Sequence, residues 1–384
     1  MHVAVIGAGA FGGWTALHLL RRGMKVTLLD AWGPGNSRAS SGGETRVIRG
    51  GYGVNGIYTQ MTARSLPLWK ENQARWNVKL FHPAGVLWMA PRNDDWAKAT
   101  LGHLREAGLP FQQLDRREIG RRWPQMNPEG LGSAILESDA GFLLARQACQ
   151  AVLAGFVQEG GEYRQRSATP GAIREGAMQA AKLSDGSELA ADQYVFACGP
   201  WLAKIFPEEI GERVTPTRQE VLFFGAPAGD PRFTEEQFPA WIDTGAQRFY
   251  GIPGNQWRGF KIADDEPGEV FDPTAGDRVP SEAAIRKARE YLAFRFPAMK
   301  NAPLVEARVC QYEMSTDGHF ILDRHPRCGN AWLAGGGSGH GFKMGPAVGE
   351  RLADLVLGLK QVDLFFALSR AGLAAKSARL RAIN

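Results

Sequence analysis

Three side chains late in the chain have the chemistry of a reactive site. Cys310 lies in the segment VCQYEM, and the later glycine-rich segment GGGSGHGFK carries His340 and Lys343. Taken alone, a cysteine on a predicted strand indicates a buried free thiol, which is the usual state of a cytosolic cysteine. The glycine turn with its histidine and lysine raises the question of a bound ligand. The other end of the chain indicates the class of that ligand.

The chain begins with a predicted strand, turn, helix and second strand whose glycines have dinucleotide-binding spacing. The apolar run VAVI leads into GAGAFG, and the second strand ends in Asp30. Gly7 allows the tight turn, Gly9 lets the backbone approach a pyrophosphate, and Gly12 lets the helix pack closely on the strand. The pyrophosphate lies on the helix N-terminus, and Asp30 accepts hydrogen bonds from a ribose. The pattern predicts a dinucleotide site and leaves NAD and FAD open.

A glycine- and serine-rich segment, residues 32–53, follows this unit and contains Arg38, Arg46 and Arg49. One interpretation is a flexible surface loop. Flexible linkers rarely carry so many arginines beside small residues, so we interpret the segment as a loop that wraps a ligand. A second turn of small residues, in the segment FACGPW, is another place where backbone can approach the cofactor. The residues of these two segments that we expect at the cofactor are Arg38, Ser40, Thr45, Arg46, Cys198 and Gly199.

The composition of the 384 residues excludes several functional classes. The net charge is +5, but Lys and Arg are dispersed and form no nucleic-acid arm or polybasic membrane patch. The four cysteines are widely spaced without a CxxC pair, which argues against a disulfide framework or a zinc site. No apolar run reaches transmembrane length. We therefore expect a cytoplasmic, monomeric protein that binds a small molecule and no metal, nucleic acid or membrane.

The remaining patterns place further elements along the chain. Residues 56–77 have helical spacing, and VKLFHPAGVLWMAP alternates as strands do. Residues 141–163 indicate one helix that ends at two glycines. Residues 215–300 are richer in strands and in Pro/Gly turns, and nucleotide-domain character returns from residue 305. The fold class is therefore α/β, with a strand-rich domain inserted into a Rossmann-like one.

This organisation predicts two domains built from separated stretches of chain. The cofactor-binding domain is expected at residues 1–80, 140–212 and 305–384. The substrate domain is expected at residues 81–139 and 213–304.

Several segments, in the same order, resemble the monomeric sarcosine oxidase family of FAD-dependent amine oxidases. They are VIGAGAFG, SSGGETRVIR, FYGIP, FKIADD, VCQY and GGGSGHGFKMGPAVGE, and the resemblance extends to about residue 357. N-methyltryptophan oxidase and the fructosyl amino acid oxidases are relatives in that family. The resemblance implies FAD and a D-amino-acid-oxidase-like two-domain fold, in which an antiparallel-sheet domain is inserted into the FAD-binding domain. It also implies oxidation of a secondary amine to an imine by hydride transfer to flavin, with O2 reduced to H2O2.

The resemblance gives Cys310 a role. In sarcosine oxidase the equivalent cysteine carries the flavin through an 8α-thioether bond, and the family's His-Gly-Phe-Lys follows at the same spacing as here. Covalent FAD through Cys310 is therefore the expectation. The chain departs from the family at Gly42, which occupies the place of a histidine linked to flavin attachment. That departure leaves the covalent bond open.

The resemblance also assigns a substrate clamp. Arg49 and Lys343 match the family's pair that holds the substrate carboxylate. The chemistry requires cations there, because a buried carboxylate needs charge-assisted donors and an arginine offers a bidentate fork. Arg49 on its own could equally be a solvated loop arginine. With both residues in the pocket, the substrate is an α-amino acid or an N-substituted one.

Four more residues are implied around the flavin. Arg46 matches an arginine over the flavin face, Lys261 matches the lysine that activates O2, and Tyr250 matches an active-site tyrosine. His340 is expected near the flavin ring. A cation near the reactive edge stabilises developing superoxide, although a lone strand lysine more often points to solvent. The late-turn residues expected at the cofactor are Gly337, Gly339, Gly341 and Lys343.

Asp265 bears on specificity. Sarcosine oxidase carries a histidine four residues after the oxygen-activating lysine, whereas the fructosyl amino acid oxidases carry an acid there, as this chain does. An acid that faces the pocket favours a substrate with an added cation or several hydroxyls. The alternative is an acidic surface turn. The substrate is accordingly expected to be an N-alkyl, N-glycosyl or cyclic amino acid rather than sarcosine.

Three other functions compete with an oxidase. A flavin amine dehydrogenase would pass electrons to a carrier other than oxygen, against which Lys261 argues. A flavin-binding protein without turnover would have no reason to keep the matched set of active-site residues. An NAD-dependent enzyme would leave Cys310 and the His340–Lys343 turn unexplained.

Overall fold

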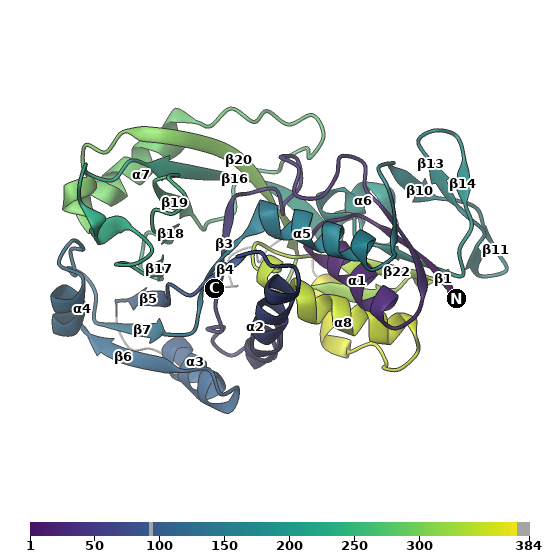
Figure 1. Ribbon diagram of the computed structural model, residues 1–384, viewed down its shortest axis with the longest axis horizontal. Coiled ribbons are helices and arrows are strands. Elements are labelled where there is room, and N and C mark those ends of the chain that lie inside the picture. Colours follow the sequence, from purple (N-terminus) through teal and green to yellow (C-terminus); the bar gives the residue numbers. More distant parts are fainter. Residues whose placement is uncertain (92–94, 375–384) are drawn as a thin grey trace.

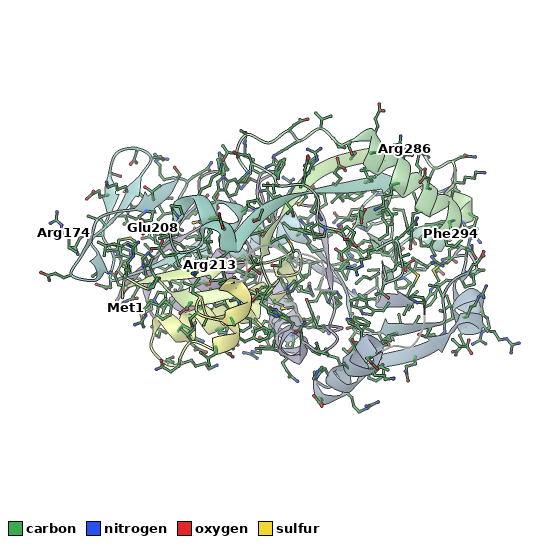
Figure 2. The ribbon with its side chains drawn as sticks, turned by 180° about the vertical axis from the view of Figure 1, so that it is seen from behind. Met1, Arg174, Glu208, Arg213, Arg286 and Phe294 are labelled. Atoms are coloured by element: carbon green, nitrogen blue, oxygen red, sulfur yellow. The ribbon has the colours of Figure 1, made fainter. Side chains whose placement is uncertain are left out.

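The computed structural model describes residues 1–91 and 95–374. Within these ranges two large sheets lie side by side along the long axis of the molecule (Figure 1). The view from behind shows Arg174, in a small hairpin, at one end of the molecule (Figure 2). It shows Arg286 and Phe294, on α7 (Glu282–Arg295), at the other end. The sequence prediction of an α/β two-domain fold is confirmed.

The first sheet is the nucleotide-binding one. Its strand order is β21-β22-β15-β1-β2-β9, parallel except between β21 and β22. The strands are β1 (His2–Ile6), β2 (Lys25–Leu29), β9 (Glu162–Arg164), β15 (Gln193–Phe196), β21 (Ile321–Arg324) and β22 (Ala331–Gly335). Strands β1 and β2 are apolar and buried along most of their length, as expected of a sheet covered on both faces.

Helices pack on this sheet and on one another to form the main core. They are α1 (Ala10–Arg21), α2 (Gly56–Arg75), α5 (Ala145–Gln158) and α8 (Gly345–Val356). Helix α1 contacts α5 and α8, and its Trp14 is buried against Trp69 of α2 with ring centroids 5.0 Å apart. The side of the sheet with α6 (Leu202–Ile205) also carries β10 (Ala168–Pro170), β13 (Ala181–Leu183), β14 (Glu188–Leu189) and the hairpin β11 (Ile173–Arg174) and β12 (Ala177–Met178).

The second sheet has eight strands in the order β20-β16-β19-β18-β17-β5-β7-β6. All neighbouring pairs are antiparallel except β17 and β5. The strands are β5 (Val86–Ala90), β6 (Phe111–Asp115), β7 (Ser133–Glu137), β16 (Val214–Phe224), β17 (Ala240–Asp243), β18 (Phe249–Ile252), β19 (Phe260–Asp264) and β20 (Leu304–Ser315). One face packs on α7 through a core that includes Trp241 and Tyr291, whose rings stack 5.6 Å apart. Part of the other face packs on α3 (Asp95–Glu106).

A three-stranded sheet connects the two large ones. It consists of β3 (Thr45–Ile48), β8 (Gly141–Leu144) and β4 (Phe81–His82), with β8 in the middle. The sequence predicted that residues 141–163 form one helix, and this prediction was wrong for the first four residues and for residues 162–163, which belong to β9. The backbone of residues 141–144 pairs with β3 and β4 instead, so α5 begins at Ala145. A short apolar run does not by itself distinguish a strand from a helix.

Two smaller helices lie beside the large sheet. They are α3 (Asp95–Glu106) and α4 (Arg116–Arg122). At the start of α4 the Asp115 carboxylate accepts a hydrogen bond from the backbone N–H of Glu118. The Glu118 carboxylate accepts one from the backbone N–H of Asp115. This capping box defines the start of the helix. No helix in the described part of the chain is long and apolar enough to span a bilayer.

The domain bounds expected from the sequence stay a proposal. Strands of the nucleotide-binding sheet come from the three stretches assigned to the cofactor domain. Strand β20 does not follow the expected bounds. It lies almost wholly within residues 305–384, which were assigned to the cofactor domain, but it pairs with β16 in the large sheet. The chain therefore passes from one sheet to the other through β20.

Candidate active site

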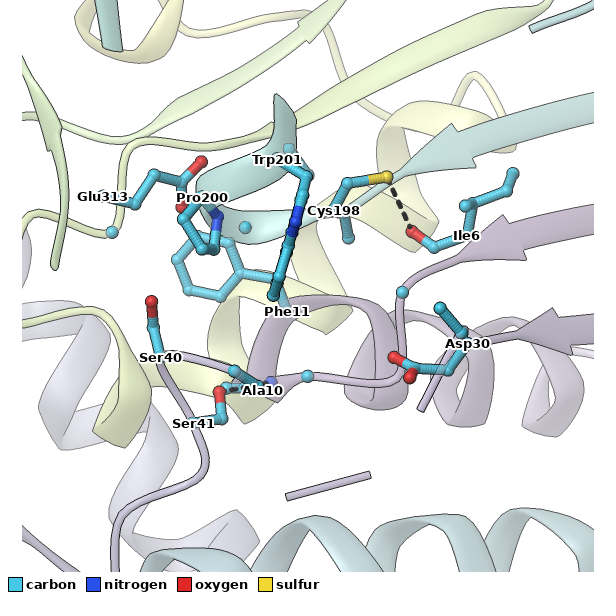
Figure 3. Close-up of a pocket in the computed structure, with 18 of the residues that line it drawn as sticks. Ile6, Ala10, Phe11, Asp30, Ser40, Ser41, Cys198, Pro200, Trp201 and Glu313 are labelled. Atoms are coloured by element: carbon cyan, nitrogen blue, oxygen red, sulfur yellow. Dashed lines mark hydrogen bonds between the residues drawn. The ribbon is translucent and has the colours of Figure 1, made fainter. Parts of the chain in front are cut away.

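A cavity of about 590 Å³ opens over the first turn of α1 and extends to β20. Its size is within the range of about 300–1,000 Å³ typical of ligand pockets. Figure 3 shows Asp30 on one side of this cavity and Ser40 and Glu313 on the opposite side. The predicted cofactor residues that line it are Gly7, Gly9, Asp30, Ser40, Arg46, Cys198, Gly199, Gly337, Gly339 and Gly341.

The glycines of the first turn differ in what requires them. Gly7 has φ +108°, and a Cβ there would lie 2.2 Å from the carbonyl oxygen of Ala197. A Cβ on Gly12 would lie 1.8 Å from the carbonyl oxygen of Gly7. At Gly9 the nearest atom to a Cβ would be the Ser41 hydroxyl at 3.4 Å, which is an ordinary contact. No protein atom therefore requires the glycine at position 9, and the open space beside its backbone suits a ligand that approaches closely.

Asp30 is held in place by backbone groups. Its Oδ2 accepts a bond from the N–H of Ala8 (2.8 Å), and Oδ1 accepts from the N–H groups of Trp32 (2.9 Å) and Gly33 (2.8 Å). Burial raises the pKa of this carboxyl group, and the three N–H donors oppose the rise. The arrangement ties the end of β2 to the glycine turn and leaves an acid at the cavity wall.

Two hydroxyl groups near the cavity lack protein partners. The Oγ atoms of Ser40 and Thr45 are buried and make no hydrogen bond. Buried polar atoms are nearly always hydrogen-bonded in folded proteins. Together with the glycine turn and the acid at β2, these atoms fit a cofactor that has a pyrophosphate, a ribose and further polar groups. The expected FAD is such a cofactor.

A second cavity, of about 460 Å³, adjoins the first and is lined by Arg46, Lys261 and Cys310. Lys261 and Cys310 come from β19 and β20, on one face of the large sheet, and Arg46 comes from β3. The Arg46 guanidinium donates to the Cys310 sulfur (3.3 Å) and to the carbonyl oxygen of Ser40 (2.7 Å). Gly43 makes room for it, because a Cβ there would lie 2.2 Å from the guanidinium.

Lys261 is buried, with 1% of its surface exposed. Its ammonium group donates to the carbonyl oxygen of Thr45 (2.9 Å) and lies 5.3 Å from the centre of the Tyr250 ring. Burial, and then the charge of Arg46, lower the pKa of Lys261 well below its ordinary value. Lys261 is therefore a buried lysine in the wall of the second cavity and not a strand lysine in solvent.

Arg49 and Lys343 converge on one tyrosine. The Arg49 guanidinium carbon lies 4.3 Å from the centre of the Tyr52 ring and 4.5 Å from that of Trp88. The Lys343 ammonium lies 5.2 Å from the Tyr52 ring and donates to the carbonyl oxygen of His340 (2.7 Å). Burial, and then the charge of Arg49, lower the pKa of Lys343 well below its ordinary value. Two cations held so close together favour an anionic ligand between them.

His340 serves as support for this pair. Its Nε2 lies 3.1 Å from the carbonyl oxygen of Gly318, so Nε2 carries the proton, and Nδ1 lies 3.4 Å from the hydroxyl of Tyr52. The ring stacks on Phe320 with a centroid distance of 4.8 Å. Burial, and then the charge of Lys343, lower the pKa of His340. The imidazole is therefore neutral and of defined tautomer.

Asp265 lies next to these cations and not in a surface turn. Its Oδ1 is 3.4 Å from the hydroxyl of Tyr312, and Arg49 and Lys343 both act on its charge. Burial is the largest influence and raises the pKa of Asp265 to about 6. Tyr312 is also hydrogen-bonded to Tyr250, which joins the Asp265 side of the site to the Lys261 side.

Two predicted or matched positions differ from expectation. Arg38 is exposed, donates to the carbonyl oxygen of Thr274 (2.7 Å), and is not among the residues that line the cavity. At Gly42 a Cβ would lie 1.9 Å from the carbonyl oxygen of Asn36, so this backbone has no room for the family's histidine. The loop thus reaches the cofactor cavity by a path that requires glycine.

The sequence did not point to three other residues of the site. Trp88 and Tyr52 sandwich Arg49, and Glu137 accepts from the N–H groups of Gly50 (2.6 Å) and Gly51 (2.9 Å) and from the Trp88 indole (2.7 Å). Glu137 ends β7 and Trp88 lies within β5, and neither spacing carries a functional signal. A buried glutamate at the end of an apolar strand was the only available hint.

Comparisons with known proteins agree with this arrangement. The family model described as FAD dependent oxidoreductase (DAO) matches residues 2–355. Monomeric sarcosine oxidase of Bacillus sp. (strain B-0618) is 29% identical over 391 residues, which covers 97% of this chain and 96% of that protein. L-proline dehydrogenase from P. horikoshii superposes with a TM-score of 0.83 at 20% identity, over 96% of this chain and 97% of that one. A modified fructosyl peptide oxidase from Aspergillus nidulans gives 0.82 at 19% identity, over 96% and 94%.

Proposed function

The chain belongs to the DAO family of FAD-dependent oxidoreductases and is sarcosine-oxidase-like, and we propose that it oxidises the secondary amine of an N-substituted α-amino acid. The electrons pass to O2, which is released as H2O2. One observation carries the proposal. Arg49 and Lys343 lie at the Tyr52 ring, and the buried Lys261 lines the cavity of Cys310. Asp265, on which the first two charges act, is bonded to Tyr312, and Tyr312 is bonded to Tyr250 beside Lys261.

In this proposal Arg49 and Lys343 bind the substrate carboxylate. The two aromatic rings hold the guanidinium in one orientation, so little side-chain freedom is lost on binding. The bound carboxylate gives Arg49 and Lys343 an anionic partner beside the Tyr52 ring. A carboxylate at this position places the α-carbon and the amine toward Tyr250, Tyr312 and Asp265.

The amine must lose a proton before it can react. The positive charges of Arg49 and Lys343 lower the pKa of a bound ammonium group, so it gives its proton to solvent and the substrate is held as the neutral amine. When bound, FAD supplies the acceptor for the hydride that leaves the α-carbon and then the electrons for O2. Loss of that hydride leaves an iminium cation, which water hydrolyses to a carbonyl compound and a smaller amine. His340 stays neutral throughout and orients Tyr52.

Lys261 acts in the second half of the cycle. O2 gains negative charge as it accepts electrons, and a fixed cation in a buried site stabilises that charge without reorganisation. The carbonyl oxygen of Thr45 holds the ammonium group in place. The reaction of O2 is completed by two protons, which yield H2O2.

An anaerobic titration tests the function. Successive additions of sarcosine, N-methyltryptophan, proline, pipecolate, fructosyl-glycine and fructosyl-lysine are made to the holoenzyme, and the yellow flavin band is followed. At least one amine is expected to bleach it, and the same amine is expected to yield one H2O2 per turnover in air. Bleaching without peroxide would support a flavin amine dehydrogenase with another acceptor. If none of the amines bleaches a flavin that dithionite reduces, the proposed substrate class is wrong.

We further propose that Asp265 faces the N-substituent of the substrate. Changing Asp265→Asn is expected to lower kcat/KM by about 10-fold to 100-fold for a substrate whose substituent carries a cation or several hydroxyls. Sarcosine should change by less than about threefold, since its methyl group makes no such bond. Steady-state kinetics with the two substrate types measures the difference.

The pH dependence and a neighbouring residue serve as controls for Asp265. Because its pKa is raised to about 6, the preference for such substrates should disappear as the pH falls below about 6, and the asparagine variant should not show this change. Asp264→Asn is the matched control, because Asp264 pairs with Lys287 on the outside. Equal losses for both substrate types in Asp265→Asn would contradict the assignment.

We also propose that FAD is bonded to Cys310. Cys310 lines the cavity beside the cofactor cavity, and the guanidinium of Arg46 donates a hydrogen bond to its sulfur (3.3 Å), which holds the sulfur in place. Acid precipitation of the wild-type protein is expected to leave the yellow colour in the pellet, and Cys310→Ser is expected to release it. Cys198→Ser is the control: Cys198 lines the larger, adjoining cavity, but its sulfur faces the carbonyl oxygen of Ile6 and burial raises its pKa. A colourless wild-type pellet would show that the bond is absent.

A further inference from the structure

Glu313 is a buried acid in the wall of the FAD cavity that the proposed reaction does not use. It lies on β20 three residues after Cys310, on the opposite face of the strand from Cys310 and Tyr312. Its exposed fraction is 6%. Figure 3 shows its carboxyl group near Pro200 and Phe11, across the cavity from Asp30.

The carboxyl group of Glu313 is only partly satisfied by the protein. Oε1 is buried and has no hydrogen-bond partner, while the backbone N–H groups of Gly336 and Gly337 lie beside the carboxylate. A Cβ on Gly335 would lie 2.4 Å from Oε1 and 2.6 Å from Leu202, so the glycine leaves room for the acid in this position. An unsatisfied oxygen in such a place costs free energy unless a ligand completes it.

The position of Glu313 indicates which part of FAD it meets. Asp30 holds the ribose end, and the N-terminus of α1 holds the pyrophosphate. Arg46 and Cys310 mark the ring end. The polyol chain that joins the pyrophosphate to the ring must therefore run past Ser40 and Glu313, which lie together on that side of the cavity. Oε1 of Glu313 and the Ser40 hydroxyl both lack hydrogen-bond partners, and the hydroxyl groups of the polyol chain can supply them.

The protonation state follows from the surroundings. The groups that face this carboxyl are the backbone amides of Gly336 and Gly337, the apolar side chains of Leu202 and Phe11, and the thiol of Cys198. Burial raises the pKa of Glu313 to about 7, and the thiol pKa of Cys198 is raised too, so neither is balanced by a cation. The negative pyrophosphate of bound FAD disfavours the ionised acid further.

We propose that Glu313 is a cofactor-positioning residue that binds the polyol chain of FAD as a neutral carboxylic acid, donating its proton to one hydroxyl group and accepting from another. FAD binding near neutral pH is then coupled to the uptake of a proton from solvent by this side chain. The coupling concerns the cofactor alone and does not depend on the substrate proposed above. In the holoenzyme the polyol chain is pinned between Ser40 and Glu313, which sets the position of the ring.

Calorimetric FAD titrations test the coupling. The full-length chain carrying Cys310→Ser keeps FAD exchangeable and is the parent, and Glu313→Gln and Glu313→Leu are made in it. Titrations in buffers of different ionisation heat measure protons taken up per FAD. With a pKa of about 7 in the free protein, the parent should take up about 0.8 proton at pH 7.5 and about 0.1 at pH 6.0. Glu313→Gln, which is always neutral, should lower the uptake at pH 7.5 to near zero.

Affinity separates this role from a purely structural one. Glu313→Gln should bind FAD within about threefold of the parent at pH 6.0, and Glu313→Leu should bind it about 10-fold to 100-fold more weakly. Glu209→Leu removes another buried acid, which pairs with His325 and Arg327. It should lower Tm without changing FAD affinity or proton uptake. Two results would overturn the proposal: equal proton uptake in parent and Glu313→Gln, or parental affinity in Glu313→Leu.

Discussion

Replacing Lys261 with methionine is expected to slow the reaction of the reduced enzyme with O2 by about 10²-fold to 10³-fold. Methionine has a volume similar to that of lysine, so the change removes the charge of the side chain and keeps its packing. The reduction of the enzyme by amine under anaerobic conditions should change little, because the substrate clamp lies at Tyr52. Stopped-flow spectroscopy measures the two half-reactions separately.

The lowered pKa of Lys261 adds a pH signature. Burial and Arg46 both disfavour its charged form, so the ammonium loses its proton at a lower pH than a free lysine does. The oxygen rate of the wild type should therefore fall as the pH rises through this lowered pKa, and Lys261→Met should show no such fall. Lys287→Met is the control, since Lys287 pairs with Asp264 and is about half exposed. An unchanged oxygen rate in Lys261→Met would remove the basis for an oxidase.

Replacing Arg49 with alanine is expected to lower kcat/KM by about 10²-fold to 10³-fold for any substrate with an α-carboxylate. The loss has two parts. The carboxylate loses a charge-assisted bidentate partner, and Lys343, which also lies near the Tyr52 ring, is left to hold it alone. Steady-state kinetics with the amine that bleaches the flavin measures the effect.

The conservative variant distinguishes charge from geometry at this site. Arg49→Lys keeps the charge but loses the planar group that lies between Tyr52 and Trp88, so it should recover only a small part of the activity. Arg64→Ala is the control, because Arg64 is exposed and pairs with Glu350. A decarboxylated analogue should bind equally well to wild type and Arg49→Ala. Full activity of Arg49→Ala would place the substrate carboxylate elsewhere.

Burial of Lys261 and Lys343 destabilises their charged forms, and negative charge brought by a ligand offsets this effect. Lys261 and Lys343 are both nearly fully buried, and each has a carbonyl oxygen as its hydrogen-bond partner. Burying an ammonium group without a carboxylate partner disfavours its charged form, which the lowered pKa values of both lysines reflect. A substrate carboxylate near Lys343, and negative charge developing near Lys261, restore the charged forms when they are needed.

The sequence alone determined the local devices of this protein. The glycine turn and the strand ending in Asp30 could both be predicted, because each is made within a short stretch of chain. A position that requires a positive φ or the absence of a Cβ can be recognised in the sequence, because glycine occupies it. The segments that resemble the family occur in the family's order, and they identified Arg49, Lys261 and Lys343 as candidate site residues. They also indicated the two-domain α/β fold.

The tertiary structure decided what those residues face. Residues 141–144 form β8 because β3 and β4 lie on both sides of them, and their own apolar pattern did not separate a strand from the start of a helix. The same pairing puts Arg46 near Cys310, although 264 positions separate them in the chain. Asp265 could have been a turn residue, and only the packing of Tyr312 and the two cations shows it inside the site.

Glu137, Trp88 and Glu313 lay outside the reach of sequence reasoning for the same reason. Each owes its role to partners from distant elements: the backbone of Gly50 and Gly51 for Glu137, and the Gly335–Gly337 turn for Glu313. Burial and the pKa shifts that follow from it arise only when such elements pack together. The sequence therefore determines which chemical groups are present, whereas long-range packing decides which of them are buried, charged and left for a ligand.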